Sequence, residues 1–331
     1  MKDLKSRHIQ GAYTSVDELL NCRQLAGDLV LATRKQSRAV ADGNVKTRYR
    51  GRGMEFAEVR PYQPGDDIRT IDWRVTARVQ SPYTKLFQEE HERPVFLLVD
   101  QRSPMFFGTR QFKAVFAARF AATVAWIAQA NNERVGALIF GDASQHDVRP
   151  RRGRGAVLDL INQLVQFNHK LDNPLTPPGG NTLADMFKDA SRVAKPGAMV
   201  VLVSDFHDFS PDCSEPLALL AKRSDVLAVH TYDPLEQQLP SSAALPIANN
   251  LRQMTVNTRK IGKSYTEAFE QHRRSLRQAF LETGIQYIHA PVTENQDGFI
   301  RDLFHRRFGA ARRSTPCARM THRRSWRNSS P

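Results

Sequence analysis

Side chains capable of polar chemistry are concentrated in one short run, GRGMEFAEVRPYQPGDDIRTIDWRVTAR, over residues 51–78. Most protein surface is rich in Lys and Glu, whereas this run combines Asp and Arg with Tyr and Trp. Arg and carboxylate groups form ion pairs of fixed geometry, and linked pairs specify one arrangement. The run therefore predicts a polar network, which we call the signature network: Glu55, Arg60, Tyr62, Gly65, Asp66, Asp67, Arg69, Asp72, Trp73 and Arg78.

The signature network allows two interpretations. Its acids and arginines could form buried ion pairs that lock this segment onto the rest of the protein, because such pairs specify geometry more than they stabilise. Alternatively, the turn PGDD could present Asp66 and Asp67 to an arginine-lined partner. The sequence leaves both possibilities open. Trp73 is expected to pack the segment against the neighbouring domain rather than to stack on a base.

Catalytic constellations are scarce in the rest of the chain. The tetrapeptide DFHD at 205–208 offers His207 as a base, but no G-x-S-x-G nucleophile elbow accompanies it. The tripeptide GKS at 262–264 resembles the end of a phosphate-binding loop, yet Asn257 stands where the first glycine is required. We therefore expect a protein that is not an enzyme.

Alternating strands and helices must position these residues. Apolar runs such as VFLLVD, which ends at Asp100, are typical of strands buried in a parallel sheet. Strands joined through helices imply right-handed crossovers, so the fold class is α/β with a doubly wound, mostly parallel sheet. Ligands of such sheets bind at the carboxyl ends of the strands. Strands are expected at 95–100, 134–140, 145–150, 198–204, 226–231 and 286–290, helices at 15–33, 112–131, 155–167, 182–194, 211–222, 265–283 and 297–307, and a hairpin within 239–258.

The run at 51–78 resembles the signature of a large bacterial family, domain of unknown function 58, which reads approximately G-x-G-x-E-F-x-x-x-R-x-Y-x-P-G-D-D-x-R-x-I-D-W-x-x-x-A-R. The resemblance extends from about residue 19 to about residue 308. Proteins of this family look like von Willebrand factor A domains and are often encoded beside MoxR-type AAA+ ATPases. The resemblance implies an N-terminal helix and signature subdomain over 1–93 and a Rossmann-like A domain over 94–309.

The same resemblance points to a metal site at the top of the sheet. In A domains that bind metal, the first strand ends in D-x-S-x-S, a later loop supplies Thr and the fourth strand ends in Asp, giving hard oxygens to Mg²⁺. Asp100, Thr182 and Asp205 stand at the corresponding positions, but Arg102 and Pro104 replace the two serines. Proline has no side-chain oxygen, and a guanidinium repels a dication electrostatically.

This pattern is that of a degenerate metal ion-dependent adhesion site. Ser103 or water could still complete a Mg²⁺ site, but we favour an arrangement in which no cofactor is bound. In that arrangement Arg102 substitutes its fixed charge for the cation and pairs with Asp100 or Asp205. The top of the sheet would then be a metal-free face for binding protein.

Composition bounds the remaining possibilities. The 331 residues carry a formal net charge of +14, and eight arginines between 305 and 331 supply much of it, so 310–331 is expected to be a basic disordered tail. The three cysteines lie far apart without metal-ligand spacing. The longest apolar stretch, 112–128, contains two charges and is short for a membrane span. These features predict a soluble, cytoplasmic protein without a membrane span.

The favoured function is that of an interaction protein that serves as adaptor or co-chaperone to a MoxR-type AAA+ ATPase during assembly or maturation of a client protein. This role is implied by the resemblance. One alternative is a metal-dependent hydrolase that uses Asp100, Asp205 and Asp208. Another is a nucleic-acid-binding protein that uses the basic loops and tail, although nucleic acid is the less expected partner.

Overall fold

A computed structural model describes residues 11–27, 29, 54–89, 94–170, 180–240, 245–248, 253–292 and 296–308. The tail expected at 310–331 and the basic stretch before residue 54 lie outside these described residues. The predicted division into three parts stays a prediction.

A six-stranded sheet in the order β10-β7-β6-β3-β4-β5 forms the centre of the described structure. Neighbouring strands pair in parallel except for β5, which runs antiparallel to β4 at one edge. Every residue of β3, β4 and β6 is buried, as their continuous apolar sequences require. The predicted α/β fold with a mostly parallel sheet is confirmed. The strands are β3 (Val95–Asp100), β4 (Val135–Phe140), β5 (Gln145–Arg151), β6 (Met199–Ser204), β7 (Asp225–Tyr232) and β10 (Gln286–Pro291).

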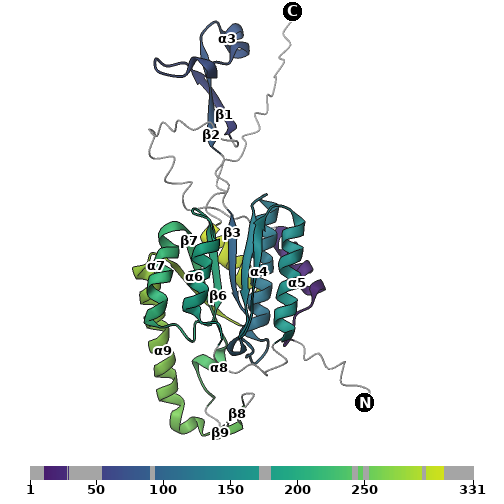
Figure 1. Cartoon of the computed structure of the whole chain (residues 1–331), viewed down its shortest axis with the longest axis vertical. Coiled ribbons are helices and arrows are strands. Elements are labelled where there is room, and N and C mark those ends of the chain that lie inside the picture. The colour runs from purple at the N-terminus through teal and green to yellow at the C-terminus, as the bar shows by residue number, and fades with distance from the viewer. Residues whose placement is uncertain are drawn as a thin grey trace, which may run out of the picture.

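Helices cover both faces of this sheet (Figure 1). Because side chains alternate along a strand, Leu97 and Val99 face one helical layer while Phe96 and Leu98 face the other. The first layer contains α1 (Val16–Gly27), α4 (Lys113–Ala130), α5 (Arg154–Lys170) and α10 (Gln296–Phe308). The second contains α6 (Leu183–Val193), α7 (Ser214–Arg223) and α9 (Thr258–Glu282). The two hydrophobic cores lie between these layers and the sheet.

The alternation also separates the two aspartates at the carboxyl edge of the sheet. Asp100 continues the series of Phe96 and Leu98 toward the layer of α6 and α7. Asp205 follows Val203 of β6, whose side chain packs in the core beside α4. The two carboxylates are therefore directed toward different helices.

The long helix α9 begins earlier than predicted. Its 25 residues start at Thr258 rather than near 265, because the Asn257 side chain caps the first turn by accepting a hydrogen bond from Arg259 N. At about 1.5 Å per residue the helix is about 37 Å long. The hairpin expected within 239–258 is present as β8 (Leu245–Ala248) and β9 (Gln253–Val256), which form a separate two-stranded sheet.

The signature residues form a small unit with its own hairpin. The antiparallel strands β1 (Met54–Pro61) and β2 (Tyr83–Glu89) enclose a short 3-10 helix, η1 (Ile68–Thr70), and a helix, α3 (Trp73–Val79). The Trp73 side chain is 68% exposed, so the expectation that it packs this segment against the sheet was wrong.

Candidate functional site

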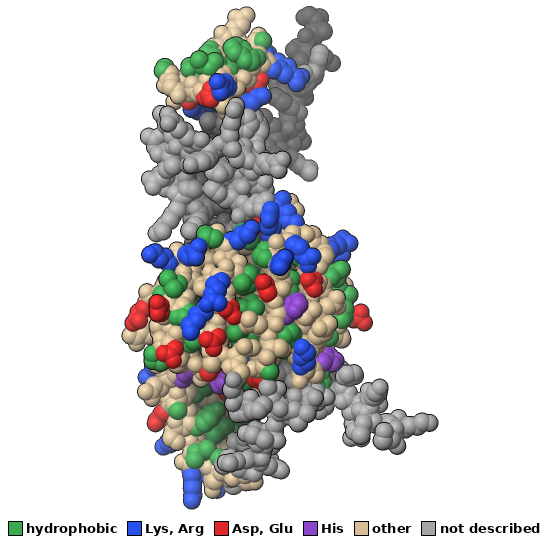
Figure 2. Space-filling model, viewed as in Figure 1, with side chains coloured by type: hydrophobic (Ala, Val, Ile, Leu, Met, Phe, Trp, Pro, Cys, Tyr) green, Lys and Arg blue, Asp and Glu red, His purple; other side chains and the backbone are tan. Residues whose placement is uncertain are grey.

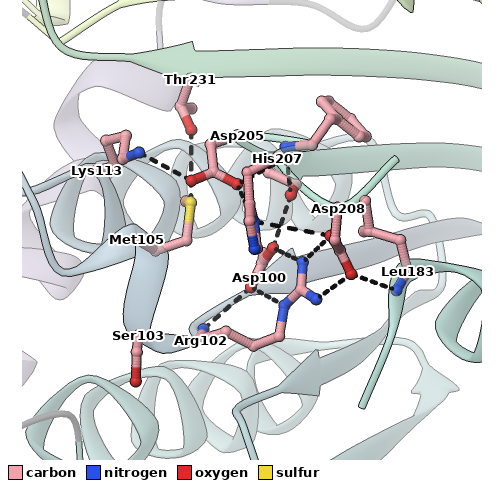
Figure 3. Close-up of polar contacts among 12 residues, drawn as sticks. Asp100, Arg102, Ser103, Met105, Lys113, Leu183, Asp205, His207, Asp208 and Thr231 are labelled. Atoms are coloured by element: carbon pink, nitrogen blue, oxygen red, sulfur yellow. Dashed lines mark hydrogen bonds and ion pairs between the residues drawn. The ribbon is translucent and has the colours of Figure 1, made fainter. Parts of the chain in front are cut away.

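Acidic and basic side chains meet where β3 and β6 end (Figure 3). Asp100 is the last residue of β3, and Ser204, the last residue of β6, donates a hydrogen bond from Oγ to Asp100 Oδ2 at 2.6 Å. The Ser204 hydroxyl also accepts a hydrogen bond from Phe206 N at 3.0 Å. The ends of these two neighbouring strands are thus joined through the Asp100 carboxylate, which is fully buried.

The Arg102 guanidinium lies between Asp100 and Asp208. Its Nε and Nη2 donate to the two oxygens of Asp100 at 3.0 and 2.7 Å. Its Nη1 and Nη2 donate to the two oxygens of Asp208 at 2.7 and 2.9 Å, and Nη1 also donates to the Asn181 carbonyl at 3.2 Å. These contacts use all five N–H donors of the guanidinium. Arg102 is 4% exposed and is held in one orientation.

The charges in this group support one another. Burial opposes the charge of Arg102, but the contacts with Asp100 and Asp208 raise its pKa well above the ordinary value. Burial likewise disfavours ionisation of Asp208, yet the hydrogen bonds and charge of Arg102 hold the pKa of Asp208 below its usual range. Burial raises the pKa of Asp100, with the contacts from Arg102 and Ser204 opposing that rise.

A second buried cation, Lys113, pairs with the second aspartate. Lys113 is the first residue of α4, and its Nζ lies 2.8 Å from Asp205 Oδ2 and 2.6 Å from Glu236 Oε1. Although burial favours the neutral acid, the Lys113 ammonium and His207 hold the pKa of Asp205 far below its usual range. Burial raises the pKa of Glu236 despite the same ammonium. Each aspartate at the edge therefore has its own fixed cation.

His207 connects the two ion-pair groups. Its Nδ1 lies 3.2 Å from Asp205 Oδ1 and 3.7 Å from Asp208 Oδ1, and its side chain is 46% exposed. Burial lowers the pKa of His207, but the hydrogen bond with Asp205 and the two negative charges raise it by more. Among the described residues, no serine or cysteine forms a hydrogen bond with this ring.

The turn that carries these residues has an unusual backbone. Phe206 has a φ of 51°, a conformation that bulky residues rarely adopt, and its side chain is fully buried. Phe206 packs edge to face against Phe280 of α9, and its carbonyl accepts a hydrogen bond from His272 Nε2 at 3.1 Å. Packing against α9 thus holds a conformation that costs about 1–3 kcal/mol.

The predicted hydroxyl ligands point to other partners. Ser103 donates from both N and Oγ to the Asp142 carboxylate, and Figure 3 shows its side chain directed away from Asp100. Pro104 continues the 3-10 helix η2 (Ser103–Met105). The Thr182 hydroxyl caps α6 and donates to Asp185 Oδ2 at 2.7 Å. The structure therefore brings Asp100, Arg102 and Asp205 to one edge but does not join Ser103 or Thr182 to them.

These side chains do not fit a divalent cation. The carboxylates that would coordinate Mg²⁺ already bind the Arg102 guanidinium and the Lys113 ammonium, and a dication between these groups would be repelled by both. Across the part of the chain that the structure describes, no group of three His, Cys, Asp or Glu side chains is arranged to hold a metal ion.

Sequence reasoning missed Lys113 and assigned Arg102 only part of its contacts. The sequence offered Asp100 or Asp205 as the partner of Arg102; in the structure Arg102 pairs with Asp100 and also with Asp208. A signal for Lys113 was present, since a lysine at the start of the apolar helix 113–130 needs a buried partner. Glu236 had no comparable local signal.

A groove of about 450 Å³ adjoins the ion pairs. It lies between the N-terminal parts of α6 and α7, and Leu183 N, at the start of α6, donates to Asp208 Oδ2 at 3.2 Å. Its lining is mostly polar and acidic, and consists of Thr182, Ala184, Asp185, Lys188, Pro211, Asp212, Glu215 and Pro216.

The acids of the signature network stabilise the signature unit itself. Asp66 pairs with Arg60 at 2.7 Å and accepts a hydrogen bond from Gln63 N at 2.9 Å, within a turn in which Gly65 has a φ of 108°. Asp67 caps η1, and Asp72 caps α3 while lying 3.4 Å from Lys85 Nζ. Tyr62 donates from its hydroxyl to the Asp66 carbonyl at 3.3 Å.

The described ion pairs lie within the signature unit, and presentation of Asp66 and Asp67 to a partner stays a prediction. The ion pairs Arg60–Asp66 and Lys85–Asp72 join residues within the unit, and Asp66 and Asp67 are used by local turns and caps. Arg69 and Arg78 are exposed and form no ion pair with another described residue. The side chain of Glu55 lies outside the described residues.

No helix in the described parts of the chain is long and apolar enough to cross a membrane.

Comparison with known proteins finds uncharacterized relatives. Uncharacterized proteins of Mycobacterium bovis and Mycobacterium tuberculosis are 33% identical over 193 residues, which are 57% of this chain and 58% of theirs. The chain thus spans little more than half the length of these relatives. An uncharacterized Bacillus subtilis protein is 43% identical over 47 residues, covering 14% of this chain and 12% of that protein.

Solved structures with detectable similarity include von Willebrand factor A domains. One from Catenulispora acidiphila aligns over 67% of this chain and 44% of its own, with a TM-score of 0.36 and 11% identity. The SpRpn10 VWA domain aligns over 64% of this chain and 94% of its own, with a TM-score of 0.34 and 12% identity.

The family comparison matches residues 58–275, which include all but the first four residues of the signature unit and continue through β7 and the hairpin β8–β9 into α9. Because this segment is more than half of the sequence, the chain belongs to the family described as "Protein of unknown function DUF58".

Proposed function

We propose that this chain is a non-enzymatic protein-interaction module that acts as an adaptor of a MoxR-type AAA+ ATPase and presents a client protein to it. The ATPase supplies mechanical work, and this chain supplies recognition. One observation supports the proposal that the chain acts without catalysis and without a metal. The buried Arg102 guanidinium donates all five of its N–H groups to Asp100, Asp208 and Asn181.

A group of ion pairs of this kind is suited to keeping a binding surface in one conformation rather than to catalysing a reaction. A guanidinium bound by two carboxylates has no donor left for a substrate. Removing either partner would leave a buried charge uncompensated, so the arrangement resists rearrangement. Lys113 fixes the neighbouring Asp205 in the same way, and the edge of the sheet keeps one geometry without a cation from solution.

The groove beside this edge is the proposed surface for the client. It opens between α6 and α7 and is lined by three acids, Asp185, Asp212 and Glu215, and one cation, Lys188, which pairs with Asp185. The net negative lining complements a basic segment. Since Asp208 is bonded both to Arg102 and to the first turn of α6, the ion-pair group sets the position of one wall of the groove.

The connection to a MoxR-type ATPase is supported by the resemblance of the signature run, which fixes the family but not the partner. The direct test is biolayer interferometry between the full chain and the recombinant, nucleotide-free MoxR-type ATPase from the same genome, with Mg²⁺ and in excess EDTA. We expect saturable binding with the same Kd in both buffers. Absence of binding would refute the adaptor role, and binding that EDTA abolishes would refute metal independence.

Hydrolysis is tested separately on the same preparation. We expect no turnover of p-nitrophenyl phosphate with Mg²⁺ or Mn²⁺, because His207 has no nucleophile within the described residues and the carboxylates are paired. Turnover that is lost in an Asp205→Asn variant would contradict the proposal and favour a hydrolase.

A further inference from the structure

Part of the signature network is explained by neither folding nor burial. Asp66, Asp67 and Asp72 stabilise turns and helix starts within the signature unit. Trp73 and Arg78 have no such role in the folded unit. Trp73 is 68% exposed, and Arg78 is exposed and forms no ion pair with any described residue. The exposed indole leaves a large apolar area in contact with water, and burying that area against a partner would be favourable.

Four of the five exposed residues of α3 share one side of the helix. At 100° per residue, Trp73, Ala77, Arg74 and Arg78 occupy a continuous arc, and all four are exposed. The opposite side carries Thr76, whose hydroxyl accepts a hydrogen bond from Tyr83 N of β2 at 3.0 Å and fixes the helix on the hairpin. We call the exposed arc the α3 face.

The signature unit exposes two further apolar residues that lie outside this arc. Ile68 in η1 is 65% exposed and Val79 at the end of α3 is 49% exposed. Hydrophobic side chains gather on this unit in Figure 2, together with Lys and Arg side chains. Tryptophan and arginine, the large side chains of the α3 face, are among the residue types that carry most binding energy in protein interfaces.

The charge of the unit distinguishes the class of partner. Residues 54–89 contain five basic and six acidic residues, so the unit has no excess of positive charge. Binding to nucleic acid or to an anionic membrane depends on such an excess. A protein surface that places carboxylates around an apolar pocket complements both the two arginines and the tryptophan, because it needs local rather than net charge.

We propose that the α3 face is a docking surface for a partner protein that offers an apolar pocket or ridge flanked by acidic side chains. Trp73 inserts into the apolar part, and Arg74 and Arg78 pair with the flanking carboxylates. This inference does not depend on the identity of the ATPase or of the client.

The test uses a defined probe, a fluorescein-labelled 18-residue helical peptide with one leucine face flanked by glutamates. Binding to the full chain is followed by fluorescence anisotropy. We expect saturable binding that weakens at least about tenfold in Trp73→Ala and in Arg74→Glu/Arg78→Glu, as at an interface hot spot. Because the altered side chains are exposed, both variants should fold normally, and far-UV circular dichroism checks this.

Two matched controls separate a specific face from general stickiness. Leu281 is 63% exposed on α9, so Leu281→Ala removes a comparable apolar group elsewhere, and Arg154→Glu reverses an exposed charge on α5. Both should bind the peptide as the unaltered chain does. The proposal is overturned if the peptide does not bind, or if the controls weaken binding as much as the α3 variants do.

The competing partners are tested on the same variants. A 20-nucleotide single strand and phosphatidylglycerol vesicles should each bind the Trp73→Ala variant and the unaltered chain equally. Loss of either interaction in Trp73→Ala would instead make the α3 face a nucleic-acid or membrane surface. Protection of Trp73 from acrylamide quenching in the isolated chain would show that the chain's own domain covers the face, and would also overturn the proposal.

Discussion

Replacement of Arg102 by methionine should destabilise the protein strongly. The change removes two bidentate pairs, leaving Asp100 without its cation and Asp208 with only the half-exposed His207 beside it, while the methionine side chain keeps much of the buried volume. Loss of one partner from a buried pair costs about 3–5 kcal/mol. For a domain of this size each kcal/mol lowers Tm by about 2–4 °C, so Tm should fall by roughly 6–20 °C.

The loss of stability in Arg102→Met should also depend on pH. In the unaltered chain Arg102 lowers the pKa of Asp208, so the ionised carboxylate contributes stability that is present above the unfolded pKa of about 3.9 and is lost as pH falls through the folded value. In the variant, Asp208 can take up a proton instead of remaining as an unpaired charge. The difference in stability between the two proteins should therefore be largest near neutral pH and shrink below about pH 4.

Urea unfolding followed by circular dichroism at pH 7.5 and pH 4 measures both effects. The matched control is Arg192→Met, which removes the same side chain from an exposed pair with Asp189, where the arginine is 75% exposed. That change should cost less than about 1 kcal/mol. A free energy of unfolding for Arg102→Met within 1 kcal/mol of the unaltered chain would refute the claim that Arg102 is the fixed cation of this edge.

Three other outcomes follow from the described geometry. Lys113→Met should also lower the free energy of unfolding by about 3–5 kcal/mol, because it leaves Asp205 and Glu236 buried without their cation. A loss below 1 kcal/mol in urea unfolding would contradict this role of Lys113. Arg102→Ser combined with Pro104→Ser should bind Mn²⁺ at least tenfold more tightly than the unaltered chain in isothermal titration, because it removes the guanidinium from the carboxylates, and equal affinities would contradict this. Burial and the neighbouring His289 lower the pKa of His230 to about 3, so this residue contributes stability that is complete above about pH 6.5 and falls by about 2 kcal/mol on acidification to pH 5. His230→Phe should reduce that fall, and an unchanged pH dependence of urea unfolding would show that His230 is not responsible.

The sequence specified the sheet better than the site. Strands such as β3 and β6 were evident because a fully buried strand needs an uninterrupted apolar run, and this is a local property. The start of α9 was placed too late, because its polar first turns depend on the Asn257 cap rather than on hydrophobic periodicity.

The ion pairs were less accessible because they join distant residues. Arg102 reaches Asp208 across 106 positions and Lys113 reaches Asp205 across 92, so no local spacing records either contact. The chemistry of the substitutions led us to expect Arg102 beside Asp100 or Asp205, and it gave no indication of Asp208. The exposure of Trp73 was missed for a related reason, since an aromatic residue beside acidic ones does not show which of its sides another element covers.

The direction of β3 bears on where two partners of such a protein would bind. The chain enters β3 at Val95, shortly after the signature unit ends at Glu89, and leaves it at Asp100 among the ion pairs. At about 3.3 Å per residue, this strand separates its two ends by roughly 17–20 Å. Under the proposed function, the carboxyl edge that would receive the client lies at one end of this strand, and the signature unit precedes its other end in the sequence. Two partners held at these places would raise one another's local concentration.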